Sequence, residues 1–172
     1  STIRMDMLLK QPNHNNRIVW MVYKPGYVDR GKEDGKPYVR WIENLATKRK
    51  VHLIWFSSAD EYLRKFNALP QGSVRAYEYF GHSNKYAFMF EYGSDIIAAS
   101  TAWLHETELN RKRASVFHPQ AACTSWGCHT GESMSQAWKQ TLGLPLRGVK
   151  GPTNYTVVGQ AKLPLAKGSW TQ

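Results

Sequence analysis

The chain has 172 residues, of which 23 are Lys or Arg and 13 are Asp or Glu, so its formal charge is +10. This length suits one domain with a substantial core. Hydrophobic residues at 42% and aromatic residues at 13% exclude a disordered chain. The two cysteines, Cys123 and Cys128, are too few for a disulfide-stapled miniprotein or a four-ligand zinc site. No apolar run approaches the roughly 20 residues of a membrane span, so we expect none.

The positive charge raises the question of a nucleic-acid partner. It is scattered along the chain, and its densest clusters are residues 48–50 (KRK) and 111–113 (RKR). Each cluster is typical of the basic last turn of a helix, where cations meet the negative end of the helix dipole. No zinc-finger, RNA-recognition or basic-zipper pattern accompanies them. Nucleic acid is therefore not the expected partner.

The N-terminal third alternates polar segments with apolar runs. Residues 1–16 are polar and predict an arm or a short edge element. Residues 17–23 (RIVWMVY) are β-branched and aromatic, which predicts a strand buried on both faces. The Gly, Pro and Asp residues of 24–37 predict a loop. A helix that opens with proline is predicted over 37–50, and a second buried strand over 51–56 (VHLIWF).

The middle of the chain continues this alternation. Ser58 and Glu61 have the spacing of a capping box and predict a helix over 61–69. Residues 73–80 (SVRAYEYF) predict a third strand. Residues 86–92 (YAFMFEY) predict a further strand, so we expect the two to form a hairpin.

The C-terminal part begins with a predicted helix over 96–113. A strand of small residues is predicted over 121–128 (AACTSWGC), followed by a helix over 132–142 that a glycine closes. Short strands are predicted within 146–151 and 155–165. Because strands and helices alternate throughout, the expected fold is a single domain over residues 1–172, a three-layer α/β sandwich with a mostly parallel sheet.

Two residues with catalytic potential follow predicted strands. His82 comes after the third strand and Cys128 after the small-residue strand, and each is preceded by a glycine, Gly81 and Gly127. The chemistry of such sheets is found at the carboxyl ends of strands, and glycine lets the backbone approach a substrate closely. If the two strands are neighbours, the imidazole and the thiol converge above the sheet.

A thiol and an imidazole together can carry out acyl transfer. The thiolate is the attacking group, and a nearby imidazolium favours that form of a cysteine. The histidine then returns a proton to the leaving amine. Free backbone N–H groups in the loop could stabilise the oxyanion, an effect often worth about 10²–10³ in rate.

The same residues resemble a known family. Residues 127–131 (GCHTG) resemble the nucleophile segment, and residues 80–82 (FGH) the histidine segment, of caspase-like cysteine peptidases, a group that includes the caspases, gingipain, clostripain and the bacterial CHAT proteases. The resemblance spans roughly residues 17–156. It implies a caspase-like sheet, with His82 as general base and Cys128 as nucleophile, and no metal or organic cofactor.

The resemblance also points to residues around the dyad. Where the family usually has a glycine after the histidine, this chain has Ser83, whose N–H could still serve in the oxyanion hole. Gly127, Trp126 and Glu132 are expected to shape or orient the site. Members of the family often cleave after an acidic or a basic residue, and the sequence does not reveal the specificity pocket.

The cysteines and histidines also have simpler interpretations. Cys128 could be an ordinary buried thiol, because free cysteine is among the most buried residue types. Cys123 is expected in the core, with a resolving or disulfide role as the alternative. His129 should point away from Cys128 and act at the surface, and His52 is expected to pack in the core. The remaining histidines, at positions 14, 105 and 118, are expected in loops or on helix surfaces.

Two rival functions remain open. Residues 81–85 (GHSNK) echo the nucleophile elbow of serine hydrolases, with Ser83 as nucleophile, although a strand is predicted after it instead of a helix. The third interpretation is a non-catalytic module that binds an acidic partner through its basic surface, because fold does not imply function.

The sequence therefore predicts a cysteine peptidase that cleaves a protein or peptide with a dyad of His82 and Cys128. Small size, positive charge and a first residue other than Met favour the toxin domain of a bacterial secreted effector, processed or cut from a longer protein. A cognate inhibitor or immunity protein would then be a further partner. Thiol chemistry favours a reducing compartment, either the cytoplasm or the cytoplasm of a target cell.

Overall fold

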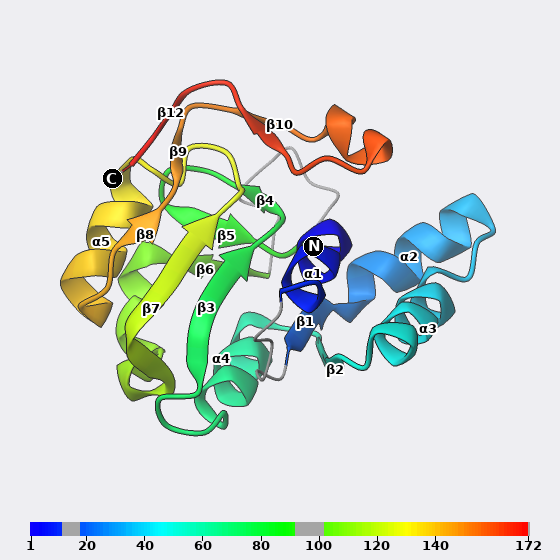
Figure 1. Cartoon of the computed structure of the whole chain (residues 1–172), viewed down its shortest axis with the longest axis horizontal. Coiled ribbons are helices and arrows are strands. Elements are labelled where there is room, and N and C mark those ends of the chain that lie inside the picture. The colour runs from blue at the N-terminus through cyan, green and yellow to red at the C-terminus, as the bar shows by residue number, and fades with distance from the viewer. Residues whose placement is uncertain (12–17, 92–101, 172) are drawn as a thin grey trace.

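The computed structural model describes residues 1–11, 18–91 and 102–171, and the chain is a mixed α/β protein (Figure 1). The helices are α1 (Thr2–Leu9), α2 (Lys24–Asp34), α3 (Tyr38–Arg49), α4 (Ala59–Asn67) and α5 (Ser133–Leu142), with 3₁₀ helices at Glu106–Arg111, Ala114–Val116 and Thr156–Gln160. The strands are β1 (Val19–Tyr23), β2 (His52–Phe56), β3 (Val74–Tyr79), β4 (His82–Ser83), β5 (Ala87–Met89), β6 (Trp103–His105), β7 (Phe117–Ser125), β8 (Leu146–Arg147), β9 (Val149–Lys150), β10 (Thr153–Asn154), β11 (Leu165–Ala166) and β12 (Ser169–Trp170).

The longer strands are parallel, as the alternation of strands and helices predicts. β1 pairs with β2, and β7 lies between β3 and β8 in a three-stranded sheet. The short strands are antiparallel: β4, β5 and β6 form one sheet, and β9–β12 and β10–β11 form two more. Within the described ranges, no ladder joins β1–β2 to β3–β7–β8. The parallel part of the fold is thus split into two sheets.

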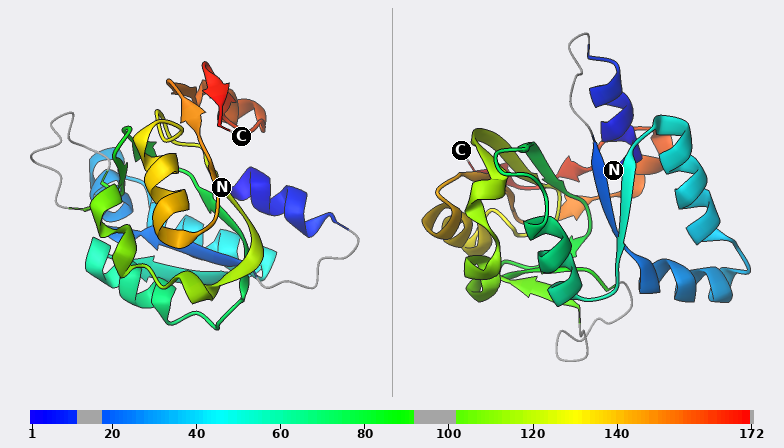
Figure 2. Two further views of the ribbon diagram at one scale, coloured as in Figure 1. Left: turned by 90° about the vertical axis from the view of Figure 1, so that its left-hand side faces the viewer. Right: turned by 90° about the horizontal axis from the view of Figure 1, so that it is seen from below.

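The main core covers one face of the β3–β7–β8 sheet. Tyr77 and Phe117 on the strands meet Phe66 of α4 and Trp138 of α5 in a cluster of tilted and edge-on aromatic rings. Phe66 is 2% exposed and Trp138 fully buried. Figure 2 shows these two helices on the same side of the strands. Aromatic side chains of this size dominate the burial of apolar area that stabilises a core.

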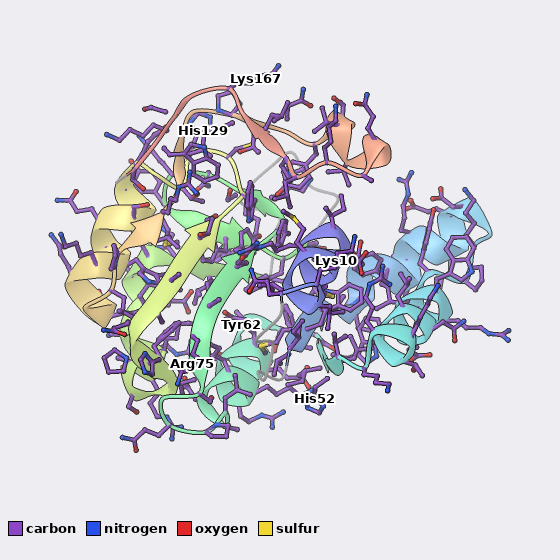
Figure 3. All side chains as sticks on the ribbon, in the orientation of Figure 1. Lys10, His52, Tyr62, Arg75, His129 and Lys167 are labelled. Atoms are coloured by element: carbon purple, nitrogen blue, oxygen red, sulfur yellow. The ribbon has the colours of Figure 1, made fainter. Side chains whose placement is uncertain are left out.

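A buried cation lies inside this aromatic cluster. Lys112, which the sequence assigned to a basic helix end, is 3% exposed and lies against the rings of Phe66 and Tyr77. Its ammonium donates to the hydroxyl of Tyr62 at 2.7 Å, and that hydroxyl lies 2.8 Å from the hydroxyl of Tyr77. Figure 3 labels Tyr62 between the sheet and α4. The expectation of a solvated charge is therefore wrong for Lys112.

A smaller core lies around β1 and β2. Met5 of α1, Ala46 of α3 and Val51 are buried together, with half-buried side chains of the two strands against them. Asp6 accepts two hydrogen bonds from Arg49, at 2.7 and 2.9 Å, which ties α1 to the end of α3. The Arg49 guanidinium holds the pKa of Asp6 below its usual value.

Several expected local structures are wrong. The described part of the expected arm contains α1, and the expected loop at 24–37 contains α2, which begins beside Pro25 and ends at Gly35 with φ 62°. Proline is tolerated in the first turn of a helix, and glycine favours the left-handed end. The described part of the helix expected over 96–113 is instead β6 followed by a 3₁₀ helix.

The expected hairpin is also corrected. β3 pairs with β7, and the strand predicted over 86–92, observed as β5, pairs with β4 and β6. β1 is also less buried than expected. The sequence predicts a strand buried on both faces, whereas Val22 is the one buried residue of Val19–Tyr23.

Among the helices of the described residues, none is both long and apolar enough to cross a membrane.

Candidate active site

The segment after β3 lies against the loop after β7. The N–H of Trp126 donates to the carbonyl of Tyr79 at 2.9 Å, and the hydroxyl of Ser83 donates to the carbonyl of Cys128 at 2.8 Å. These bonds lie on the two sides of His82. Because β3 and β7 are adjacent and parallel, their carboxyl ends meet at one edge of the sheet. The sequence prediction that the two loops converge is supported by this packing.

His82 is an exposed residue at the start of β4. Its carbonyl accepts a hydrogen bond from the hydroxyl of Tyr79 at 2.5 Å, and the same hydroxyl lies 3.0 Å from the carbonyl of Met89, the residue opposite His82 in the ladder. The turn between β3 and β4 is thereby fixed from within.

The sulfur of Cys128 lies in the loop beyond β7 and is half-buried. The N–H of Thr153 donates to this sulfur at 3.3 Å, and the carbonyl of Thr153 lies 3.9 Å from it. Thr153 begins β10, which belongs to a segment that we call the C-terminal flap (residues 151–171). Figure 1 shows the flap in orange and red across the ends of β3 and β7. Sequence reasoning missed Thr153, because nothing in its neighbourhood marks it as a partner of a residue 25 positions away.

Gly127 is required by a close approach of two segments. A Cβ at this position would lie 2.1 Å from the hydroxyl oxygen of Ser83 and 3.3 Å from the carbonyl oxygen of Gly81. The N–H of Gly127 donates to the hydroxyl of Ser125 at 3.3 Å. The N–H of Cys128, in contrast, has no acceptor among the described residues.

Trp126 connects three parts of the site. Its ring is stacked on Phe80, with centroids 5.7 Å apart and an angle of 8° between the planes. Its indole N–H donates to Glu78 at 3.1 Å, and its carbonyl accepts from the hydroxyl of Tyr155 in the flap at 3.0 Å. These contacts link Trp126 to the strand before His82 and to the flap, and its expected role in shaping the site stays a prediction. Tyr155, like Thr153, was missed.

Glu132 and His129 form a pair of their own. The imidazole Nδ1 of His129 lies 2.7 Å from the Glu132 carboxylate, and His129 has the left-handed φ of 60°. Figure 3 shows His129 beside the flap. Glu132 was expected to orient the catalytic site, and its observed contact is instead with His129. The surface role expected for His129 agrees with its 45% exposed side chain.

Two glycines further along the loop let backbones touch. A Cβ at Gly131 would lie 2.5 Å from the carbonyl oxygen of Gly148, and a Cβ at Gly148 would lie 2.6 Å from the nitrogen of Gly131. The N–H of Gly131 also donates to the carbonyl of Val149 at 3.0 Å. The loop that follows Cys128 is therefore fastened directly to the strand that leads into the flap.

Cys123 occupies a different environment from Cys128. It is 4% exposed in β7, and burial raises the pKa of its thiol to about 11, against the smaller opposite effects of Trp138 and Lys112. Burial likewise lowers the pKa of Lys112 well below its usual range. The core role expected for Cys123 is confirmed by its burial.

The other histidines lie away from this loop pair. His52 is exposed at the start of β2, so its expected core role is wrong (Figure 3). His105 caps the 3₁₀ helix at Glu106–Arg111, and the ring of His118 accepts from the N–H of Gln120. His14 lies outside the described residues.

Ser83 lacks the setting of a serine nucleophile. The elbow of a serine hydrolase places its serine on a turn between a strand and a helix. Ser83 instead lies in β4, opposite Phe88 of β5, and its hydroxyl donates to a backbone carbonyl. Its observed contact fixes the position of the Cys128 loop.

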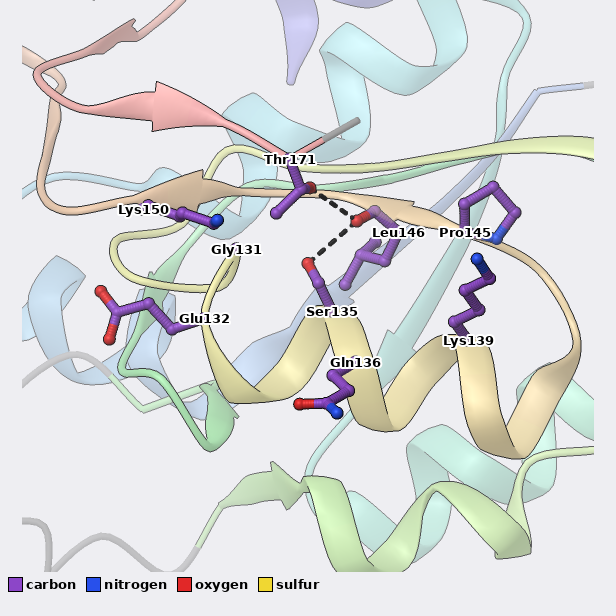
Figure 4. A pocket seen from close by; sticks show the side chains of 9 residues that line it. All are labelled: Gly131, Glu132, Ser135, Gln136, Lys139, Pro145, Leu146, Lys150 and Thr171. Atoms are coloured by element: carbon purple, nitrogen blue, oxygen red, sulfur yellow. Dashed lines mark hydrogen bonds between the residues drawn. The ribbon is translucent and has the colours of Figure 1, made fainter.

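Two cavities lie near the loops. The larger, of about 390 Å³, lies over α5, where Ser135 and Thr171 both bind the carbonyl of Leu146 (Figure 4). Lys139 and Lys150 also line it, and neither His82 nor Cys128 does. The smaller, of about 170 Å³, includes Phe80 and Gly81, the two residues before His82.

In the parts of the chain that the structure describes, no three His, Cys, Asp or Glu side chains lie close enough together to hold a metal ion.

Comparison with known proteins does not assign the chain to a family. No family model matches the chain, and neither a curated protein nor a solved structure matches it significantly.

Proposed function

We propose that this protein is a cysteine peptidase in which Cys128 is the nucleophile and His82 the general acid and base. One observation carries the proposal: the segment around His82 is bonded on both sides to the loop that holds Cys128. The contacts are Trp126 N–H to Tyr79 and Ser83 hydroxyl to Cys128. This packing supports a dyad that spans two neighbouring strand ends.

The reaction would proceed in two halves. The thiolate of Cys128 attacks the carbonyl carbon of the peptide bond, and the carbonyl becomes an oxyanion. As the oxyanion collapses, the carbon–nitrogen bond breaks and the imidazolium of His82 gives its proton to the leaving amine. His82 then takes a proton from a water that attacks the thioester, and collapse of the second oxyanion breaks the carbon–sulfur bond, releases the carboxylic acid and restores the thiolate of Cys128 and the imidazolium of His82.

The backbone of the nucleophile itself offers an oxyanion donor. The N–H of Cys128 has no acceptor among the described residues, whereas the neighbouring N–H of Gly127 donates to Ser125. A fixed N–H aimed at the developing charge is typically worth about 10²–10³ in rate. The Thr153 N–H holds the sulfur from the flap side, at 3.3 Å.

The architecture supports a caspase-like fold as part of the proposal. The resemblance puts the histidine and the cysteine at strand ends, and here these residues follow β3 and β7, which are adjacent and parallel. The two parallel sheets, β1–β2 and β3–β7–β8, would be the two parts of the caspase-like sheet. The wider setting, a bacterial toxin domain acting in the cytoplasm with a cognate inhibitor, stays a prediction.

Cleavage of a peptide library tests the function. The purified protein would be mixed with peptides from a digest of a whole proteome, and new termini would be mapped by mass spectrometry. We expect Cys128→Ala to reduce new termini by at least about 10³-fold and His82→Ala by about 10²–10⁴-fold. His52→Ala is the matched control, because His52 is exposed and remote on β2.

The result that overturns the proposal is equally direct. Either the unmodified protein generates no more new termini than Cys128→Ala, or His82→Ala is as active as His52→Ala. A circular-dichroism melt of each variant identifies any loss that is due to unfolding.

A further inference from the structure

The smaller cavity lies beside the proposed catalytic residues. Phe80 and Gly81 form one wall, and His82 follows them directly. A further part of the lining belongs to the flap and includes Tyr155 and Val158. The hydroxyl of Tyr155 binds the carbonyl of Trp126, two residues before Cys128. The cavity thus lies beside the turn that holds His82, and its flap residues are bonded to the loop that leads to Cys128.

Most of the side chains that line this cavity are apolar. Ile3 of α1 with Leu163 and Pro164 of the flap complete this set, while Ser1 and the hydroxyl groups of Tyr27 and Tyr155 add polar atoms. No Asp, Glu, Lys or Arg side chain is among the described residues that line it. Its volume is about 170 Å³. An apolar cavity of about 150 Å³ is large enough to take up benzene. A single aromatic or branched aliphatic side chain therefore matches this cavity in size and polarity.

The Glu78 carboxylate lies two residues before Phe80 but does not line the cavity. Its side chain is 14% exposed. One oxygen accepts from Arg4 at 2.6 Å and the other from the indole of Trp126 at 3.1 Å. Glu78 is therefore neutralised and bonded, and a basic substrate side chain would have to break these bonds to pair with it.

We propose that this cavity receives the side chain on the acyl side of the bond to be cleaved, so that the enzyme cuts after an aromatic or large aliphatic residue. The inference rests on the proposed peptidase function and adds its substrate class. A charged side chain in the same place would lose its hydration with no oppositely charged side chain among the described lining residues, which disfavours it. The specificity would then differ from that of family members that cut after acidic or basic residues.

A set of matched covalent probes tests the preference. Peptidyl acyloxymethyl ketones that differ only in the residue next to the ketone, as Phe, Leu, Gly, Asp or Lys, would be compared by the rate at which each alkylates Cys128. We expect the Phe and Leu probes to react at least tenfold faster than the others, because even one methylene in an apolar pocket changes specificity by about tenfold or more.

The outcomes separate this inference from the function on which it rests. If no probe alkylates Cys128, the peptidase proposal fails, and the substrate class with it. If the Asp, Lys or Gly probe reacts fastest, or all react equally, Cys128 is still reactive and only the preference is overturned.

A variant in the flap sharpens the test. Val158 lines the cavity and touches neither Cys128 nor His82 in the described contacts, so Val158→Asp should shift the preference towards the Lys probe by at least tenfold. Leu165→Asp is the control, since Leu165 is 52% exposed on β11 and does not line the cavity. An unchanged order of probes in folded Val158→Asp would overturn the assignment.

Should Val158→Asp fail to fold, Val158→Phe provides the second measurement. The larger ring would occupy part of the cavity, so the Phe probe should lose at least tenfold in rate while the Gly probe stays within threefold. Equal losses for the two probes would contradict the proposal.

Discussion

The two cysteines lie five residues apart in the sequence and in opposite surroundings. Cys123 lies in the middle of the β3–β7–β8 sheet, under the aromatic core, with the buried Lys112 nearby. Cys128 lies beyond the end of β7, half-buried, with its sulfur in contact with Thr153. The strand ends at Ser125, so that Cys123 lies within the sheet and Cys128 lies in the half-buried loop beyond it.

The largest expected difference between the two regions is in alkylation rate. With a pKa of about 11, Cys123 carries only about a thousandth of its population as thiolate at pH 8, and it is buried as well. We therefore expect iodoacetamide to modify Cys128 at least about 100-fold faster in the native protein. Time points analysed by mass spectrometry measure both rates in one sample.

Unfolding supplies the control for this experiment. In concentrated guanidinium chloride the two rates should agree within a few-fold, because both environments are lost. Equal alkylation rates for Cys123 and Cys128 in the native protein would contradict the difference in environment between the core and the edge of the sheet.

The next expected effect concerns the core cation. The rings around Lys112 favour its ammonium by about 2 kcal/mol, but burying an unpaired charge costs several kcal/mol, so burial prevails and lowers the pKa of Lys112. We expect Lys112→Met to be about 1–4 kcal/mol more stable than the unmodified protein at pH 7. Lys162→Met, at an exposed position, should change stability by less than about 0.5 kcal/mol.

The stability difference between Lys112→Met and the unmodified protein should also depend on pH. A folded pKa below the unfolded value means that the unfolded chain binds more protons between the two values, so stability rises with pH there. The advantage of Lys112→Met should therefore shrink as the pH rises from 7 towards the ordinary lysine pKa of 10.5. Denaturant titrations at pH 7 and at pH near 9.5 measure it. If Lys112→Met were instead less stable than the unmodified protein by the same amount at both pH values, the aromatic rings would stabilise the ammonium form of Lys112.

The smallest expected effect is that of Ser83→Ala, at the edge of the sheet where β3 and β7 end. Ser83→Ala removes the hydroxyl that donates to the Cys128 carbonyl, and such a bond contributes about 0.5–1.5 kcal/mol. We expect a stability loss of this size and less than a tenfold loss of peptide cleavage. Ser169→Ala, exposed on β12, is the control. A loss of activity of 10³-fold or more would instead favour Ser83 as the nucleophile.

The sequence predicts the parallel strands and their ends well, because each is a compact apolar run with its own boundaries. The runs at 17–23, 51–56, 73–80 and 121–128 correspond to β1, β2, β3 and β7. Since parallel neighbours end at one edge, the approach of the His82 and Cys128 loops follows from these runs. The helices α3, α4 and α5 also follow from their periodicity and caps.

Features that depend on distant contacts could not be predicted in this way. α1 is tied down by Asp6 to Arg49 and by Arg4 to Glu78, pairs that are 43 and 74 residues apart. Lys112 looks like a helix-end cation in the sequence, and only the packing of α4 and α5 around it buries it. The contact of Thr153 with Cys128 likewise has no local signal.

The touching backbones of Gly131 and Gly148 restrict how this protein can diverge in evolution. A methyl group at either position would meet backbone atoms of the other, which have no rotamer with which to move aside. A homologue that keeps the loop after Cys128 should therefore have glycine at both positions, even where the residues at positions 82 and 128 differ. The pair of glycines would then be a better indicator of common descent than the residues at positions 82 and 128.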